Sequence, residues 1–310
     1  MAARRIVGAG AGAGAGAGFA VVARSGSVLR LANPSADLPQ LERLCTALRG
    51  PGLDLDPNYI VVAAAVGKFA KAGPLPTASH PARAAGDDGR GIRVAVVDVA
   101  ESTDGGVLSS AAGHATFAAG LVRGLAPGAD VQVVAALDAD GLGTDFDVAR
   151  ALFELAAGDP PAVINLSLTA LAASAPIAMT AALTELAARH PDVLVVAAAG
   201  NDGATEPAWP AAAKTVLAVG TPAGYSNRGW WVDFTIAAEG VVGEFPQGVR
   251  ETGDDLVEHH GGHAAWTGTS FAAPQVAGML AALLGRGHTP SGAVAQLRRT
   301  AVVTAPSTVS

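Results

Sequence analysis

The segment that decides the fold reads GTSFAAPQVAG and spans Gly268–Gly278. Ser270 opens a run of small and apolar residues that predicts a helix over Phe271–Gly285. Two other polar residues precede Ser270 in the chain. Asp98 ends the largely apolar run of residues 92–97, and His114 lies in a Gly-His-Ala-Thr stretch. A carboxylate, an imidazole and a hydroxyl therefore follow one another in the order Asp, His, Ser.

These three residue types together fit nucleophilic catalysis. A serine hydroxyl is a poor nucleophile near neutral pH, so an imidazole must take its proton and later return it to the leaving group. A buried carboxylate can hold that imidazole in one tautomer and stabilise its cation. These roles assign Ser270 as nucleophile, His114 as general base and acid, and Asp98 as orienting carboxylate. Taken singly, each residue fits a turn or a helix cap better.

The Ser270 segment resembles the nucleophile motif of the subtilisin-like serine proteases, the subtilase family, whose triad also runs Asp, His, Ser along the chain. The resemblance covers roughly Ile92–Leu284. It implies a serine endopeptidase that hydrolyses peptide bonds through an acyl-enzyme intermediate, acting on a polypeptide substrate. Two alternatives stay open: a specialised peptide-maturation protease, and a catalytically weakened peptide-binding relative.

A further segment resembles the family's oxyanion hole. The stretch Val193–Asn201 predicts a buried strand that ends in Gly-Asn. By the resemblance, the Asn201 side chain and the backbone N–H of Ser270 would stabilise the charge of the tetrahedral intermediate. The sequence Asn-Asp-Gly also predicts a turn at this point, and the two interpretations are compatible.

The resemblance also implies a substrate site. An extended substrate would pair beside Ala162–Leu168, interpreted as an edge strand. The residues expected to bind substrate are Ser167, Leu168, Thr169, Ala198, Ala199 and Gly200. Thr169-Ala170 replace two glycines that are common in the family. Because glycines let a substrate backbone approach closely, this replacement leaves the shape of the specificity-pocket wall undetermined by the sequence. This departure, with Val99-Ala100 and Phe117, motivates the peptide-binding alternative.

Apolar runs that alternate with helical patterns predict an α/β fold. Strands this uniformly apolar favour a mainly parallel sheet covered by helices on both faces, which is the subtilisin-like architecture that the resemblance implies for residues 92–310. The predicted strands are Arg93–Val97, Val131–Ala135, Val163–Leu168, Leu194–Ala198 and Val216–Val219. The predicted helices are Asp145–Ala157, Ala175–Arg189, Phe271–Gly285 and a tail helix near Ser291–Val302.

The N-terminal part predicts a small α+β appendage. We divide it into a glycine- and alanine-rich stretch over residues 1–18, a prodomain-like segment over 19–66 and a linker over 67–91. The segment reads as strands at Phe19–Val22 and Val28–Leu31, a helix at Leu38–Leu48 and a strand at Leu53–Ala63. Within that strand, Asp56–Tyr59 resembles the end of a subtilisin-type prodomain, which implies a folding aid and a temporary inhibitor. The alternative is an extension that packs on the sheet.

Composition excludes several partners. The chain has 310 residues, of which 50% are apolar and 15% charged, enough to bury a large core. A net charge of −7 without a Lys/Arg cluster argues against nucleic acid and anionic membrane surfaces. No segment reads as a membrane span. Arg4-Arg5 and the uncharged Ile6–Ala23 have the outline of an export signal, which slightly favours export over the cytoplasm.

No cofactor is expected. The single Cys45 cannot form an intramolecular disulfide or build a metal site by itself. His259, His260 and His263 are separated by glycines, which predicts solvated loop histidines rather than a metal site. Relatives often carry calcium, for which Asp138, Asp140 and Asp145 are candidate oxygen ligands, but their spacing matches no calcium loop.

Overall fold

The computed structural model describes residues 5–9, 20–32, 37–49, 54–63, 73–102, 105–109, 111–252 and 255–300. Most of the glycine- and alanine-rich stretch lies outside these residues, and so does the start of the expected linker. The predicted export signal lies largely outside them as well.

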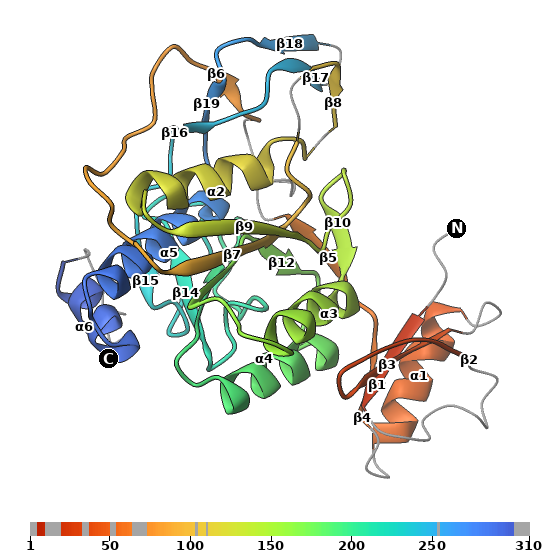
Figure 1. Ribbon diagram of the computed structural model, residues 1–310. Helices are drawn as coiled ribbons and strands as arrows, with labels where there is room; N and C mark the ends of the chain where they lie inside the picture. Colours follow the sequence, from red (N-terminus) through yellow and green to blue (C-terminus); the bar gives the residue numbers. More distant parts are fainter. Residues whose placement is uncertain are drawn as a thin grey trace, which may run out of the picture.

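A sheet of six parallel strands forms the centre of the molecule (Figure 1). From one edge to the other it runs β15 (Phe234–Thr235), β14 (Val216–Gly220), β13 (Leu194–Ala198), β11 (Val163–Leu166), β7 (Arg93–Asp98) and β9 (Asp130–Ala135). Each adjacent pair is in parallel register. The predicted parallel sheet is confirmed.

Helices cover both faces of this sheet, because alternate strand residues point to opposite sides. Ala95 and Val97 pack on one face with helices α3 (Asp145–Ala156) and α4 (Ile177–Arg189). Val94 and Val96 pack on the other face, where the core is completed by α2 (His114–Leu125), α5 (Thr269–Gly285) and α6 (Pro290–Thr300). Figure 1 shows the two layers above and below the sheet. The predicted α/β fold with helices on both faces is confirmed.

Helix α2 is an element that the sequence analysis did not name. Gly120 and Gly124 lower its helix propensity. Both glycines lie where a side chain would be crowded: a Cβ at Gly120 would be 3.1 Å from Glu244, and one at Gly124 would be 2.9 Å from the Ala82 carbonyl oxygen. Helix α2 therefore forms because it packs on α5 and on these close neighbours, although the helix propensity of its own sequence is low.

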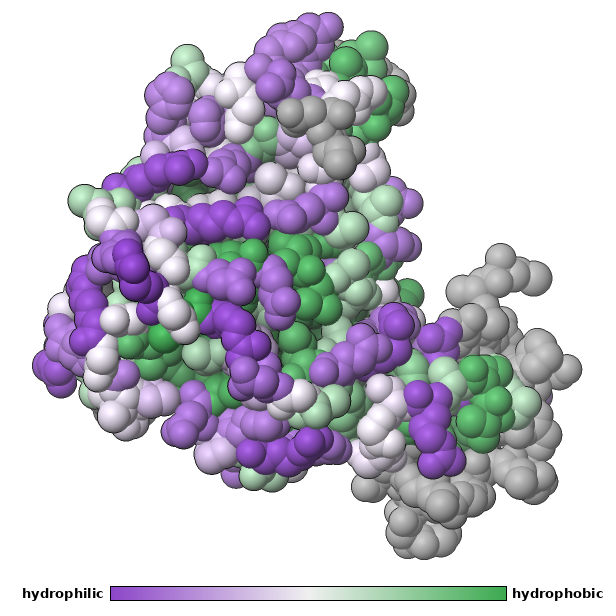
Figure 2. Space-filling model, in the orientation of Figure 1, coloured by the Kyte–Doolittle hydropathy of each residue, from purple (hydrophilic) through white to green (hydrophobic). Residues whose placement is uncertain are grey.

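Two small sheets lie beyond α2 (Figure 1). One contains β16 (Val241–Glu244), β19 (His263–Trp266) and β6 (Leu75–Pro76), and the other contains β18 (Asp255–His259), β17 (Gly248–Thr252) and β8 (Val107–Leu108). Neither was predicted: all of their strands are short, and β6 and β8, of two residues each, pair with strands far away in the chain. Strands β17 and β18 are neighbours in the sequence and pair with each other, and the sequence analysis did not name them. Apolar residues reach the surface at β8 and β18, where Val107 and Leu256 are exposed (Figure 2).

The N-terminal appendage combines a four-stranded antiparallel sheet with one helix beside α3 and α4 (Figure 1). Its strand order is β2 (Ala20–Ser25), β3 (Val28–Ala32), β1 (Arg5–Ala9) and β4 (Asp54–Pro57), and its helix is α1 (Leu38–Arg49). The strands expected near Phe19 and Val28 and the helix expected after Leu38 are present. Strand β1 was not expected within residues 1–18; it forms because β3 and β4 pair with both of its edges.

The predicted strand Leu53–Ala63 is wrong as a single element. Its first half is β4 of the appendage, and its second half is β5 (Ile60–Ala63), the middle strand of another sheet. The residues between the two halves bind the start of α3 instead. The Tyr59 carbonyl accepts a hydrogen bond from the Asp145 N–H at 3.0 Å, and the Asn58 Oδ1 accepts one from the Phe146 N–H at 3.2 Å. These polar contacts divide the strand.

Two buried carboxyl groups meet where the appendage contacts α3. Asp56 and Asp145 are both fully buried. Burial first, and the nearby Asp56 charge second, raise the pKa of Asp145 to about 8, although backbone N–H groups partly oppose this. The Tyr59 hydroxyl donates to Asp56 at 3.3 Å, while the nearby cation, Arg30, pairs with Asp147 at 3.4 Å. A neutral Asp145 avoids repulsion between the two carboxylates.

We expect the free energy of unfolding of the intact chain to fall as pH rises between about 4 and about 8. Asp145 keeps its proton in the folded chain up to a pKa of about 8, whereas the unfolded chain loses it near the ordinary value of 3.8. The folded state therefore binds more protons across this window, and raising the pH weakens it. Asp145→Asn should remove this part of the slope, measured by urea unfolding at several pH values.

Asp147→Asn is the matched control. It alters a carboxylate of the same helix that is paired with Arg30 and partly exposed. The pH slope of this control should stay close to that of the unaltered chain. Equal slopes for the unaltered chain and Asp145→Asn would contradict the assignment.

Candidate active site

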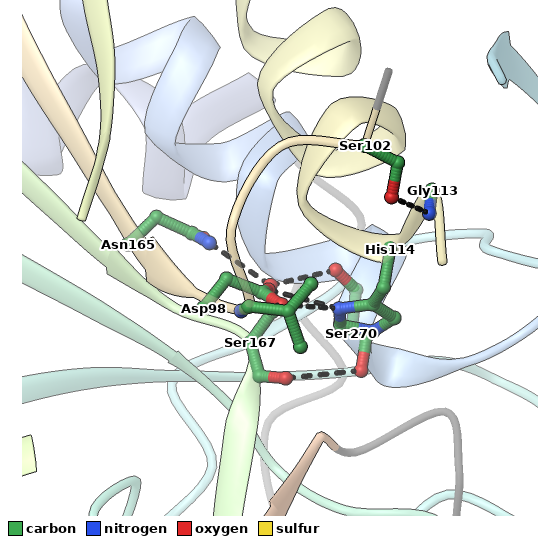
Figure 3. A network of polar contacts seen from close by, with 8 residues as sticks. Asp98, Ser102, Gly113, His114, Asn165, Ser167 and Ser270 are labelled. Atoms are coloured by element: carbon green, nitrogen blue, oxygen red, sulfur yellow. Dashed lines mark hydrogen bonds and ion pairs between the residues drawn. The ribbon is translucent and has the colours of Figure 1, made fainter. Parts of the chain in front are cut away.

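Asp98 and His114 form a buried ion-pair-like contact at the carboxyl end of the sheet (Figure 3). Asp98 is the last residue of β7, and His114 is the first residue of α2. The His114 Nδ1 lies 2.8 and 2.9 Å from the two Asp98 carboxylate oxygens, and the Val99 N–H donates to Asp98 Oδ1 at 2.7 Å. Because carboxylate oxygens only accept, Nδ1 is the ring nitrogen that carries a proton and donates it to Asp98. In the tautomer with one ring proton, Nε2 is therefore an acceptor.

Local backbone geometry fixes the start of α2. Gly113 has φ of +78°, and a Cβ there would lie 2.4 Å from the Phe245 ring, so a larger residue would clash. Its N–H donates to Ser102 Oγ at 2.9 Å. The His114 ring packs edge-on against Trp266, with ring centroids 5.6 Å apart. Its Nε2 is buried and has no hydrogen-bond partner among the described residues.

Ser270 lies in the first turn of α5, beside the Asp98–His114 contact (Figure 3). Its carbonyl accepts a hydrogen bond from Ser167 Oγ at 2.8 Å, and Ser167 Oγ accepts one from Asn165 Nδ2 at 2.9 Å. The Ser270 hydroxyl donates to the Ser167 carbonyl at 3.4 Å, so in the described chain it is turned to Ser167 rather than bonded to His114. All three predicted triad residues are brought into one fully buried cluster.

Asn201 is held by the residue next to Ser270. Its Oδ1 accepts hydrogen bonds from both the backbone N–H and the hydroxyl of Thr269, each at 3.0 Å. This orientation places the Nδ2 donor on the opposite side of the amide group. Gly200 before it has φ of +98°, and a Cβ there would lie 2.5 Å from Asn227 Nδ2, so only glycine fits.

The predicted substrate residues lie on two neighbouring segments at the carboxyl ends of β11 and β13. Ser167, Leu168 and Thr169 lie between β11 and the end of β12 (Leu168–Ala170), and Ala198, Ala199 and Gly200 lie at the end of β13 and just after it. The interpretation of Ala162–Leu168 as an edge strand is wrong for β11, which β7 and β13 flank on both sides. Strand β12, which follows β11 in the chain, instead pairs in antiparallel register with β5.

The three candidate calcium ligands make other contacts in the structure. Asp138 Oδ1 accepts from the N–H groups of Asp140 and Leu142, at 3.0 and 2.9 Å, and so closes a turn. Asp145 is buried against Asp56, with a raised pKa that opposes the charged form a cation requires. Within the described ranges, no three His, Cys, Asp or Glu side chains converge as metal ligands.

The histidine segment differs from the expectation of solvated loop residues at two positions, because His259 ends β18 and the half-buried His263 begins β19. His259 is buried at the end of β18 and stacks on Phe245, with ring centroids 4.4 Å apart. Burial lowers its pKa. His260 is exposed and binds Glu258 at 2.7 Å. The prediction failed at His259 and His263 because the small sheets were not foreseen.

Asn165 and Thr269 are the residues of the site that sequence reasoning missed. Asn165 precedes Ser167 by two residues, and a period of two places both on the same side of an extended chain. A polar residue inside an otherwise apolar strand was the available signal. Thr269 adjoins Ser270, but nothing in the sequence indicated that it would hold Asn201.

Comparisons with known proteins identify the family of this chain. The model of the subtilase family matches residues 77–310. The alkaline elastase YaB of Bacillus sp. (strain YaB) is 33% identical over 244 residues, or 70% of this chain and 60% of that protein. Subtilisin BL of Lederbergia lenta is 31% identical over 239 residues, or 68% of this chain and 81% of that protein. The chain thus spans about 60% of the length of the elastase.

Two solved structures share the fold. A lanthipeptide protease has a TM-score of 0.55 at 22% identity, covering 68% of this chain and 80% of that one. The prenylagaramide maturation protease PagA has a TM-score of 0.52 at 25% identity, covering 67% and 80%. None of the helices in the described ranges has the length and apolar character that crossing a membrane requires. With its central sheet, its buried site and the family match over most of its length, the chain belongs to the subtilase family of subtilisin-like serine proteases.

Proposed function

We propose that this chain is a serine endopeptidase in which Asp98, His114 and Ser270 form the catalytic triad. The observation that carries the proposal is the Asp98–His114 contact. Both carboxylate oxygens lie within 2.9 Å of one ring nitrogen, in a fully buried site beside Ser270. Such a contact holds the imidazole in the tautomer that can accept a proton at Nε2.

The proposed reaction has two steps. In the first, Ser270 Oγ attacks the carbonyl carbon of the substrate while His114 Nε2 takes the hydroxyl proton. The tetrahedral intermediate carries its charge near Asn201 Nδ2 and the Ser270 N–H, and Asp98 stabilises the imidazolium. The C–N bond then breaks, the proton passes to the leaving amine, and an ester remains on Ser270. In the second step, water attacks that ester while His114 takes a proton from the water. The bond between the acyl carbon and Ser270 Oγ then breaks, the proton passes from His114 to Ser270 Oγ, and the acid is released.

This reaction needs one small rotation. The Ser270 hydroxyl must turn from the Ser167 carbonyl, at 3.4 Å, towards His114 Nε2. The bond that it leaves is long, and the Nε2 acceptor has no competing partner among the described residues. The catalytic hydrogen bond would form when substrate binds, as in other enzymes whose free-state contacts are loose.

Strand β5 supports a second part of the proposal, in which the N-terminal segment inhibits the site. β5 lies between β12 and β10 (Leu142–Thr144), antiparallel to both. The Ala63 N–H donates to the Gly141 carbonyl and the Ile60 carbonyl accepts from the Leu171 N–H, both at 2.8 Å. An extended substrate would pair in the same way by adding a strand. Ser270 is fully buried in the chain that holds β5.

The register of β5 indicates which bond would be cut. Ala63 pairs with Leu168, so a peptide that continues the register brings its next residue opposite Ser167. The Ser167 carbonyl is the group that Ser270 Oγ contacts. In the sequence the next residues are Ala64 and Ala65, so self-cleavage in this register would cut between them.

A specialised maturation protease is the second candidate. The similarity to PagA, whose name states that it is a maturation protease, favours it. Both candidates use the same triad and differ in the range of peptides they cut. Product analysis on a peptide library separates them, because a maturation enzyme would cut few of the sequences that a general endopeptidase cuts.

We expect a fluorophosphonate to label the purified chain at Ser270. Ser270→Ala should abolish labelling, and Asn201→Ala should lower kcat for a peptide by about 10²–10³-fold, because one oxyanion donor is lost. Labelling and peptide hydrolysis are the measurements, with Ser174→Ala, at an exposed serine outside the site, as the control. A folded chain that never reacts, even after release of its N-terminal segment, would instead be a peptide-binding member of the family.

We also expect self-cleavage to produce a new N-terminus at Ala65. N-terminal sequencing and intact mass would detect this product in the unaltered chain and not in Ser270→Ala. A product that begins elsewhere would show that β5 does not set the register of cleavage.

Inhibition by β5 predicts a difference between two neighbouring substitutions. Val61 is fully buried and Ile60 is 53% exposed. Val61→Asp would bury an unpaired charge and weaken the strand, since such burial costs several kcal/mol. We expect labelling of the intact chain to become at least about tenfold faster in Val61→Asp and to change little in the control Ile60→Asp. Equal rates in both variants would contradict inhibition by this strand.

A further inference from the structure

The two faces of β12 have different surroundings. Ser167 and Thr169 are two residues apart and so point to the same side, while Leu168 and Ala170 point to the other and pack in the core with α3 and α4. The side chain of Ser167 reaches the Ser270 carbonyl at 2.8 Å. Thr169 therefore lies on the face of β12 that is turned towards the active site.

The Thr169 side chain lies opposite Gly200. Its hydroxyl oxygen is 3.6 Å from the point where a Cβ of Gly200 would be. The residue is 8% exposed, and its hydroxyl is buried with no hydrogen-bond partner among the described residues. Gly200 cannot carry a side chain, because Asn227 lies 2.5 Å from that Cβ position. Between these two facing positions, Thr169 supplies a side chain and Gly200 supplies none.

This space is where the residue before the cleaved bond would place its side chain. A peptide in the register of β5 brings that residue opposite Ser167, with its carbonyl near Ser270 and Asn201. Gly200 precedes Asn201, and Thr169 follows Ser167 on the same face. The side chain would therefore enter between residues 167–169 and 199–201.

We propose that Thr169 closes this pocket and restricts the enzyme to substrates with a small residue, alanine, glycine or serine, immediately before the cleaved bond. The inference rests on the proposed function and adds its substrate class. The Thr169 methyl and hydroxyl occupy volume that a branched or aromatic side chain would need, and close-packed walls adjust little. The chain's own sequence agrees, since Ala64 follows Ala63 in the strand that would inhibit the site.

The test uses the full chain carrying Val61→Asp, with peptides that differ only in alanine, leucine or phenylalanine before the cleaved bond. We expect kcat/KM for the alanine peptide to exceed that for the leucine peptide at least about tenfold. Adding Thr169→Gly should raise kcat/KM for leucine and phenylalanine at least about tenfold and change the alanine value less than about threefold. Thr169→Ser, which removes only a methyl group, should give an intermediate shift and provides a second variant if Thr169→Gly folds poorly.

Ala170→Gly is the matched control, because Ala170 adjoins Thr169 but faces the core. Its preference should match that of the parent chain. Equal cleavage of alanine and leucine peptides by the parent, or an unchanged preference in both Thr169 variants, would overturn the role of Thr169 and leave the protease intact. A parent that fluorophosphonate does not label would instead overturn the proposed function, and the inference with it.

Discussion

The attachment of the start of α5 to the ends of two parallel strands is the constraint on which the site depends. Ser167 binds the Ser270 carbonyl after β11, and Thr269 binds both Gly200 and Asn201 after β13. Because parallel strands end at one edge of a sheet, these contacts lie beside Asp98 at the end of β7. Hydroxyl, imidazole and amide are thus positioned by backbone elements rather than by flexible loops.

The sequence predicted an element or a site residue where the pattern lies within one continuous segment. The apolar runs predicted the parallel strands, because a strand buried on both faces must be apolar throughout. The Gly-Thr-Ser motif, the residue ending β7 and the Gly-His pair indicated which side chains would meet. Strands β1, β6 and β8 escaped prediction because each has only two to five residues and pairs with partners far away in the chain. Thr269 escaped for the same reason, since its role exists only once Asn201 lies beside it. Strands β17 and β18 were missed although they pair with each other as neighbours in the sequence.

The contact between the appendage and α3 combines features with opposite effects on stability. Asn58 and Tyr59 satisfy two N–H groups at the start of α3 that the helix itself leaves without partners. Asp56 and Asp145 place two carboxyl groups in the same buried region, which is favourable only while they share at most one charge. The segment that resembles a prodomain end therefore binds the helix through the Tyr59 carbonyl and the Asn58 side chain, and the adjacent Asp56 is tolerated while Asp145 keeps its proton.

The short length of β10 and β12 has a consequence for the chain once β5 has left. Two strand edges would then face water with unsatisfied backbone groups, and such edges can join molecules into aggregates. Each is only three residues long, and they face each other across the width of a single strand. A gap of this width admits one extended peptide and excludes the edge of a folded sheet from another copy. In the proposed function, the same gap would receive a single substrate strand.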